Sequence, residues 1–250
     1  MTLRIAMWSG PRNISTAMMR AWENRPDTAV VDEPFYACYL EATGLNHPGR
    51  EEVIASQPTD WRAVVAALTG QVPDRKAIHY QKHMTHHMLP GIGRDWLQHV
   101  DNCFLIRAPA EVVASYAETR NAPTFEDLGF LQQGELFDQV ADRLGHAPPV
   151  IDASDVLRNP AGMMAALCAA LGVDFDARML SWPPGRRRTD GVWAKHWYAS
   201  VERSTGFNPL RAGSKPVPRP LEPLVQAALP IYERLAAHRL PPLPVDGRQP

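Results

Sequence analysis

Short apolar runs alternate along the chain with longer segments in which apolar residues recur at helical spacing. The apolar runs predict five strands, at residues 3–8, 28–32, 77–81, 102–106 and 150–152. The periodic segments predict helices at residues 15–24, 61–68, 125–144 and 161–171, and a further helix begins at Pro109, where proline is well tolerated. Because the strands are continuously apolar rather than alternating, we expect helices to cover both faces of the sheet.

The alternation of strands with helices predicts an α/β fold in three layers. This order favours a central parallel sheet of about five strands, joined by right-handed crossovers. The length of 250 residues suits a single domain, residues 1–250. The 24 prolines crowd toward the C-terminus. We therefore expect a proline-rich extension from about residue 215, with an extended connector at 215–220 and a surface tail at 241–244.

The charge balance and the cysteines argue against several classes of protein. A total of 26 Lys and Arg residues against 27 Asp and Glu residues leaves a net charge of -1, so neither nucleic acid nor an anionic membrane is an expected partner. Cys38, Cys103 and Cys168 are far apart and odd in number, which suggests neither a disulfide framework nor a zinc cluster. No signal peptide is apparent, and no run approaches the roughly 20 apolar residues of a membrane span. We expect a soluble, cytoplasmic protein.

The segment 9–16 joins the first predicted strand directly to a helix, and it is a candidate anion site. Ligands of parallel sheets bind at the carboxyl ends of the strands, and amides at a helix N-terminus suit a phosphate or sulfate. The candidate binding residues are Gly10, Arg12, Asn13, Ser15 and Thr16. The segment is not a Walker A motif, because the positions for Gly-Lys-Ser/Thr hold Ser15, Thr16 and Ala17. The alternative is a turn in which Ser15 caps the helix and Arg12 faces water.

A second candidate anion element follows the fourth predicted strand. Arg107 stands at the strand end, and Ser115 lies about two turns into the next helix. The arginine offers a planar fork of donors and the serine a hydroxyl, which together suit a phosphate. The alternative is a surface ion pair beside an ordinary helix serine. Two such elements on separate strands favour a nucleotide that carries phosphates at both ends of its ribose.

These two elements resemble the signature elements of the sulfotransferase family that uses 3′-phosphoadenosine-5′-phosphosulfate (PAPS). The likeness covers residues 3–172 and is greatest to bacterial sulfotransferase-like proteins. It implies a P-loop-like fold, PAPS as sulfuryl donor, the first element at the 5′-phosphosulfate, and Arg107 with Ser115 at the 3′-phosphate. Many members have Lys-Ser-Gly-Thr-Thr where this chain has residues 12–16, so Arg12 replaces the lysine and Ile14 replaces the glycine.

Sulfuryl transfer to a hydroxyl or amine also needs a group that removes the acceptor's proton. Glu33, in a Glu-Pro context just past the second strand, resembles the base of carbohydrate sulfotransferases. His83, next to Lys82, resembles the Lys-x-His segment of cytosolic sulfotransferases, and its ordinary pKa suits a base. Both candidates stay open, and Glu33 could alternatively cap a helix or pair with an arginine.

No metal is expected, because a sulfuryl group carries less negative charge than a phosphoryl group. The histidines at 79, 83, 86 and 87 are the one candidate metal cluster. His83 and His87 have helical spacing, but the Pro-Gly pair at 90–91 leaves room for little more than one helical turn.

The C-terminal third combines basic residues with aromatic ones. Arg187 or Lys195 could complete the nucleotide site, and the aromatic residues of 193–198 could line an acceptor pocket or pack in the core. The acceptor implied by the resemblance is a small molecule or carbohydrate. Two other functions stay open: a nucleotide-dependent kinase with an atypical phosphate loop, and a non-catalytic nucleotide-binding regulatory protein. The sequence also leaves open whether the chain forms a homodimer.

Overall fold

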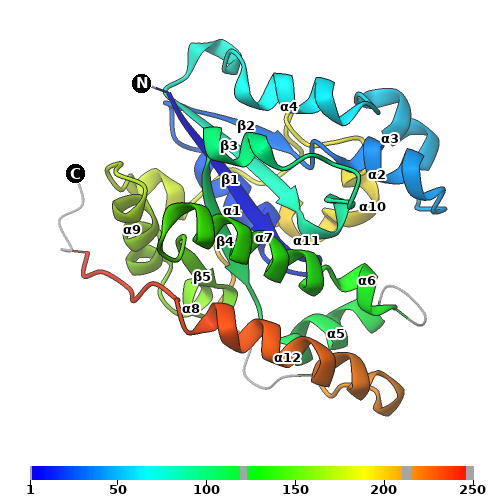
Figure 1. Ribbon diagram of the computed structural model, residues 1–250. Coiled ribbons are helices and arrows are strands. Elements are labelled where there is room, and N and C mark those ends of the chain that lie inside the picture. Colours follow the sequence, from blue (N-terminus) through cyan, green and yellow to red (C-terminus); the bar gives the residue numbers. More distant parts are fainter. Residues whose placement is uncertain (1, 119–122, 210–214, 246–250) are drawn as a thin grey trace.

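The computed structural model describes residues 2–118, 123–209 and 215–245. Its centre is a parallel sheet with the strand order β2-β3-β1-β4-β5 (Figure 1). The strands are β1 (Leu3–Ser9), β2 (Thr28–Asp32), β3 (Ile78–Met84), β4 (Asp101–Ile106) and β5 (Val150–Asp152). This sheet, covered by helices, confirms the predicted fold class. After β1 the chain forms β2 and β3 on one side of it, and then crosses to form β4 and β5 on the other side. The topological switch point of the sheet therefore lies at β1, and folds of this kind bind ligands at the switch point.

Helices cover both faces of the sheet. They are α1 (Ser15–Glu23), α2 (Tyr36–Thr43), α3 (Arg50–Ser56), α4 (Trp61–Thr69), α5 (Pro109–Ala117), α6 (Phe125–Leu128), α7 (Phe130–Leu144), α8 (Ala153–Arg158), α9 (Pro160–Ala170), α10 (Ala194–Trp197), α11 (Ala199–Glu202) and α12 (Glu222–Ala236). Short 3-10 helices lie at Pro73–Arg75, Thr85–His87, Asp95–His99, Ala177–Leu180 and Arg219–Leu221. None of the described helices is long and apolar enough to cross a membrane.

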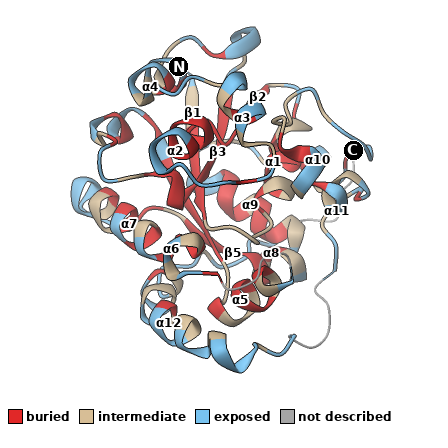
Figure 2. Cartoon of the chain, turned by 90° about the vertical axis from the view of Figure 1, so that its right-hand side faces the viewer, coloured by how far each residue is buried: buried red, intermediate tan, exposed pale blue. Residues whose placement is uncertain are grey.

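Each face of the sheet has its own apolar core, because side chains of a strand alternate between the two faces. Ile5 and Met7 of β1 pack with side chains of α1 and α9, whereas Ala6 and Trp8 pack on the other face with side chains of α4 and α7. The strands are buried and the outer surfaces of the helices are exposed (Figure 2). The chain therefore has three layers, and the ends of the strands are fixed in place.

The helix predicted over residues 125–144 is wrong in one respect, because it is two helices. Gly129 has a φ of 69° and ends α6 before α7 begins. A Cβ atom at this position would lie 2.6 Å from the Oγ1 of Thr85, so the close approach of the chains requires glycine. Both helices contact the 3-10 helix Thr85–His87, which follows β3.

The third strand is longer than predicted and ends at Met84 rather than at residue 81. Lys82 and His83 therefore lie inside β3, not in a loop after it. Since neighbouring residues of a strand point to opposite faces, these two side chains cannot share one site.

The chain after residue 215 is more ordered than its prolines indicate. Helix α12 packs against α5 and α7 and reaches β5 (Figure 1). The backbone of Leu240 then donates a hydrogen bond to Val150 (2.9 Å), and that of Leu243 donates one to Gly162 (3.0 Å). Residues 215–218 belong to no helix or strand, and residues 240–243 run along the surface beside β5 and α9.

Candidate functional site

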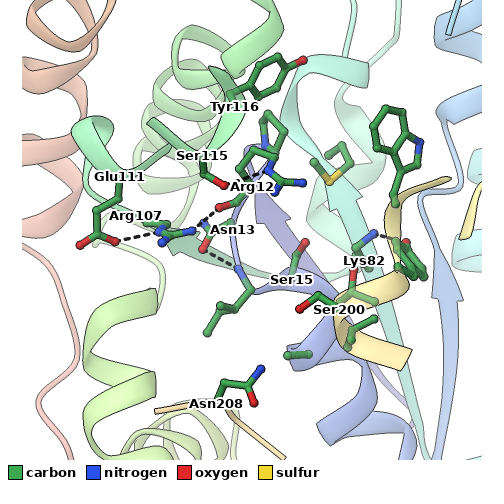
Figure 3. A pocket seen from close by; sticks show the side chains of 18 of the residues that line it. Arg12, Asn13, Ser15, Lys82, Arg107, Glu111, Ser115, Tyr116, Ser200 and Asn208 are labelled. Atoms are coloured by element: carbon green, nitrogen blue, oxygen red, sulfur yellow. Dashed lines mark hydrogen bonds and ion pairs between the residues drawn. The ribbon is translucent and has the colours of Figure 1, made fainter. Parts of the chain in front are cut away.

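A cavity of about 820 Å³ lies at the carboxyl ends of β1, β2, β3 and β4. Its wall includes eight of the residues singled out from the sequence: Arg12, Asn13, Ser15, Thr16, Glu33, Lys82, Arg107 and Ser115. Figure 3 labels all of these except Thr16 and Glu33. Residues 197–209 close the opposite side. The topology of a parallel sheet therefore brings both predicted anion elements and one candidate base into one space.

The loop after β1 is fixed by its own hydrogen bonds. Asn13 donates from Nδ2 to the carbonyl oxygen of Leu105 (3.0 Å), and its Oδ1 accepts from the backbone of Ile14 (3.0 Å). Gly10 does not line the cavity; a Cβ atom there would lie 2.7 Å from the carbonyl oxygen of Leu128. Its role is to allow that close approach.

Helix α1 begins at Ser15, directly behind this loop. None of the described side chains caps its N-terminus, and its first turn holds no acidic residue. The first amides of a helix have no acceptor within the helix, and its dipole favours negative charge there. Ser15 and Thr16 add hydroxyl donors beside these amides. This end of the cavity is suited to an anionic group.

The second anion element lies against the first. Arg107 donates from Nη1 to the carbonyl oxygen of Arg12 (2.6 Å) and from Nε to Glu111 (2.9 Å). Arg12 in turn donates from Nε to the Oγ of Ser115 on α5 (3.1 Å). Burial and the neighbouring charge of Arg107 lower the pKa of Arg12 from its ordinary value. An anion between the two guanidinium groups would stabilise the charged form of Arg12 and so offset both effects.

A buried cluster of charges lies where β2 and β3 end. The ammonium group of Lys82 contacts Asp32 (2.8 Å), Glu33 (2.5 Å) and the hydroxyl of Tyr198 (2.8 Å). That hydroxyl donates to the Oδ2 of Asp32 at 2.7 Å. Against the effect of burial, the carboxylates of Asp32 and Glu33 raise the pKa of Lys82 well above its ordinary value, so the ammonium stays charged.

Glu33 is the most exposed charged group of this cluster, which lines the cavity through Glu33, Lys82 and Tyr198. Its side chain is 11% exposed, against 1% for Asp32 and 2% for Lys82. Burial and the neighbouring Asp32 raise the pKa of Glu33, whereas Lys82 opposes the rise. Its φ of 42° is rare for a residue other than glycine, and strained backbone of this kind concentrates at functional sites.

His83 lies outside the cavity, on the other face of the sheet. Its ring stacks on Trp8 with the ring centres 4.3 Å apart, and its Nε2 is 3.3 Å from the Oε1 of Gln81. Burial, together with the positive charges of His79 and Lys82, lowers its pKa to about 3. Of the two candidate bases, the structure places Glu33 in the cavity and His83 in the core.

Aromatic and imidazole rings form the wall beyond Glu33. His87 stacks on Tyr36 (ring centres 4.7 Å apart), and the hydroxyl of Tyr36 is 2.8 Å from the Nδ1 of His47. His86 and Trp197 complete this wall. Among the described residues, no group of His, Cys, Asp and Glu side chains has the arrangement of a metal site.

Arg187 and Lys195, the two late basic candidates, lie outside the cavity wall. Lys195 forms an exposed ion pair with Glu52 (2.7 Å), and Arg187 lies 4.0 Å from Glu23. Lys215 lines the cavity instead and forms an ion pair with Glu118. Tyr198 belongs to the aromatic segment 193–198 and lines the cavity, but the sequence does not predict its contact with Lys82, because 116 residues separate the two and no local pattern links them.

A family model described as a sulfotransferase domain matches residues 3–239. The chain therefore belongs to the sulfotransferase-domain family. The match extends beyond the segment 3–172, on which the sequence resemblance rests. It includes the residues that close the cavity and helix α12.

Curated relatives match nearly the whole chain in sequence, and solved structures share its fold. Branched-chain-amino-acid aminotransferase-like proteins 1 and 2 of Arabidopsis thaliana are 36% and 32% identical to it over 236 residues, 94% of this chain. The chain spans 42% and 41% of their lengths. A sulfotransferase from Alicyclobacillus acidocaldarius has a TM-score of 0.54 at 14% identity, covering 96% of this chain and 97% of that one. The sulfotransferase domain of the Synechococcus PCC 7002 olefin synthase has a TM-score of 0.52 at 16% identity, covering 96% of each.

Proposed function

We propose that the protein transfers a sulfuryl group from PAPS to a hydroxyl or amine of a small molecule or carbohydrate. The observation that carries the proposal is the hydrogen bond from Arg107 to the carbonyl oxygen of Arg12, because it joins two anion elements in one cavity. A nucleotide with phosphates at both ends of its ribose needs two such elements. PAPS is a nucleotide of this kind, and it is the donor that the family resemblance implies.

The two anionic ends of PAPS match the two anion elements of the cavity. The 5′-phosphosulfate would lie at the N-terminus of α1, where helix amides and the hydroxyls of Ser15 and Thr16 supply donors. The 3′-phosphate would lie between Arg107 and Ser115. The sulfuryl group would then face Glu33 and the ring-lined wall, where an acceptor has room to bind.

Glu33 is the proposed base. Its Oε1 accepts from Lys82, while its Oε2 makes no hydrogen bond with a described residue and can accept the acceptor's proton. Its raised pKa brings its basicity closer to neutral pH, where a general base works best. Lys82 keeps a positive charge beside the reacting group and balances the charge of Glu33 before transfer.

The kinase alternative fits the site less well. The loop has no Walker A lysine, and Asp32, the aspartate at the end of β2, already binds Lys82 and Tyr198. A non-catalytic regulatory protein remains the second candidate function. It would bind the same nucleotide without turnover.

Transfer of ³⁵S from labelled PAPS to a panel of phenols, alcohols, amines and sugars, in the presence of EDTA, tests the proposal. We expect a labelled product with at least one acceptor class from the wild type, a far smaller yield from Glu33→Gln, and an unchanged yield from Lys195→Ala as the surface control. Nucleotide binding without a labelled product from any class would favour the regulatory function. Magnesium-dependent ATP turnover would favour the kinase.

A further inference from the structure

The guanidinium group of Arg12 does not point toward the N-terminus of α1. It lies over α5, where its Nε donates to the Oγ of Ser115 at 3.1 Å, and Figure 3 shows it on the side of Tyr116 and Ser115, away from Ser15. The resemblance of the loop to other sulfotransferases predicts the opposite, namely that Arg12 contacts the 5′-phosphosulfate. The second anion element therefore holds two arginines, Arg12 and Arg107.

At this end of the cavity, the neighbouring cations have ion-pair partners and Arg12 has none among the described residues. Arg107 forms an ion pair with Glu111, and Lys215 forms one with Glu118. Among the described residues, no carboxylate forms an ion pair with Arg12, although the charge of Glu118 acts on it from a greater distance. Burial and Arg107 disfavour the charge of Arg12, as the lowered pKa of Arg12 indicates. One half-buried positive charge is therefore available to bind an anion.

The backbone holds this orientation. Arg12 has a φ of 55°, in the left-handed region that non-glycine residues rarely adopt, and Arg107 binds its carbonyl oxygen. Because Arg107 holds the backbone rather than the side chain of Arg12, this contact survives substitution of the side chain. The position of the loop and the charge at residue 12 can therefore be tested separately.

We propose that Arg12 and Arg107, with Ser115, form a two-arginine clamp on the terminal 3′-phosphate, so that Arg12 determines the preference for a 3′-phosphorylated nucleotide. A terminal phosphate carries close to two negative charges and three acceptor oxygens, and guanidinium groups bind such oxygens in pairs. The inference rests on the proposed function. The 5′ end is then held by the amides of α1 and the hydroxyls of Ser15 and Thr16.

Calorimetric titration with 3′,5′-ADP and with AMP separates the two ends of the nucleotide. We expect the wild type to prefer 3′,5′-ADP by at least about tenfold. Arg12→Ala should reduce this preference to less than about threefold while AMP affinity changes by less than about twofold. Arg12→Lys should keep part of the preference, because one ammonium keeps the charge but not the paired donors. Lys195→Ala is the matched control and should behave like the wild type, and each variant's melting temperature reports its folding.

The outcomes separate this inference from the proposed function. A wild type without a preference for 3′,5′-ADP would overturn the nucleotide assignment, and the clamp with it. A wild-type preference that Arg12→Ala retains would overturn the clamp alone. Equal losses of affinity for 3′,5′-ADP and AMP in Arg12→Ala would place Arg12 at the 5′ end instead. Should Arg12→Ala fail to fold, the same comparison is made with Ser115→Ala, which removes the acceptor that holds the guanidinium and should also reduce the preference.

Discussion

The Nη1 of Arg107 donates a hydrogen bond to the backbone carbonyl oxygen of Arg12, 2.6 Å away. The two residues are 95 positions apart, but each follows one of two paired strands, β1 and β4. Because β1 and β4 are neighbouring parallel strands, their carboxyl ends lie side by side and the loops that follow them meet. The hydrogen bond joins the two candidate anion elements into one wall of the cavity.

Arg107→Ala should remove the preference for 3′,5′-ADP over AMP, because the planar donor group at the end of β4 is lost. We expect a wild-type preference of at least about tenfold to fall to near unity, with AMP affinity nearly unchanged. Calorimetric titration of both nucleotides gives this ratio. A variant that still discriminates as the wild type does would show that the 3′-phosphate lies elsewhere.

Glu33→Gln should lower turnover by roughly 10² to 10⁴, the usual loss when a general base is removed, with nucleotide affinity nearly unchanged. His83→Asn is the matched variant and should lower turnover less, because His83 lies in the core beside Trp8. The rate of transfer from labelled PAPS at saturating donor measures both. If His83→Asn abolishes turnover while Glu33→Gln retains most of it, Glu33 is structural.

The pH dependence of turnover follows from the raised pKa of Glu33. A base acts in its unprotonated form, so turnover should be high above the raised pKa and should fall as the pH decreases through it. The acid limb of the pH profile should lie above the pKa of an ordinary glutamate, which is about 4.3. An acid limb at or below that ordinary value would contradict the role of Glu33.

Buried histidines should make the fold less stable in mild acid. Burial lowers the pKa of His79 to about 4 and that of His83 to about 3. Between these values and the ordinary pKa of about 6.5, the unfolded chain binds protons that the folded chain does not, so stability falls as the pH decreases. Each such histidine contributes a slope of roughly 1.4 kcal/mol per pH unit in this window.

Urea denaturation of the wild type and of His83→Asn between pH 7.5 and 5 measures this slope. Glu33, Asp101 and Asp152 have raised pKa values and act in the opposite direction, so the difference between the two proteins is the informative quantity. We expect a shallower loss of stability toward acid pH in His83→Asn. Parallel curves for the two proteins would show that His83 does not contribute to the slope.

Tyr198→Phe should destabilise the protein by about 1–3 kcal/mol, because Asp32 and Lys82 each lose one of their buried hydrogen-bond partners. Tyr80→Phe is the matched control, since the buried hydroxyl of Tyr80 has no hydrogen-bond partner among the described residues. Its removal should be neutral or stabilising. Free energies of unfolding from urea titration compare the two, and equal losses would contradict the role assigned to Tyr198.

The sequence predicts the sheet well because its signals are local. The strands at 28–32 and 150–152 have the predicted bounds, and the candidate site residues at the ends of β1, β2 and β4 follow from the rule for parallel sheets. The third strand shows the limit of this reasoning. It continues for three positions beyond residue 81, where polar residues hide the strand pattern, and this extension places His83 on the opposite face from Lys82.

Long-range contacts account for the other differences. Gly129 divides a helix that looks continuous by its periodicity, because the chain there passes close to Thr85. Tyr198 joins Asp32 and Lys82 from a segment whose sequence shows only charge mixed with aromatic residues. Neither partner is near in sequence, so no pattern within a window of a few turns can indicate the contact.

Calorimetric titration of the wild type with 3′,5′-ADP, AMP and ATP, each with magnesium and with EDTA, tests the central claim most directly. A site for PAPS should bind 3′,5′-ADP at least about tenfold tighter than AMP, a difference of about 1.4 kcal/mol, and equally well with magnesium or EDTA. Equal affinity for 3′,5′-ADP and AMP, or tightest binding of ATP only with magnesium, would contradict it.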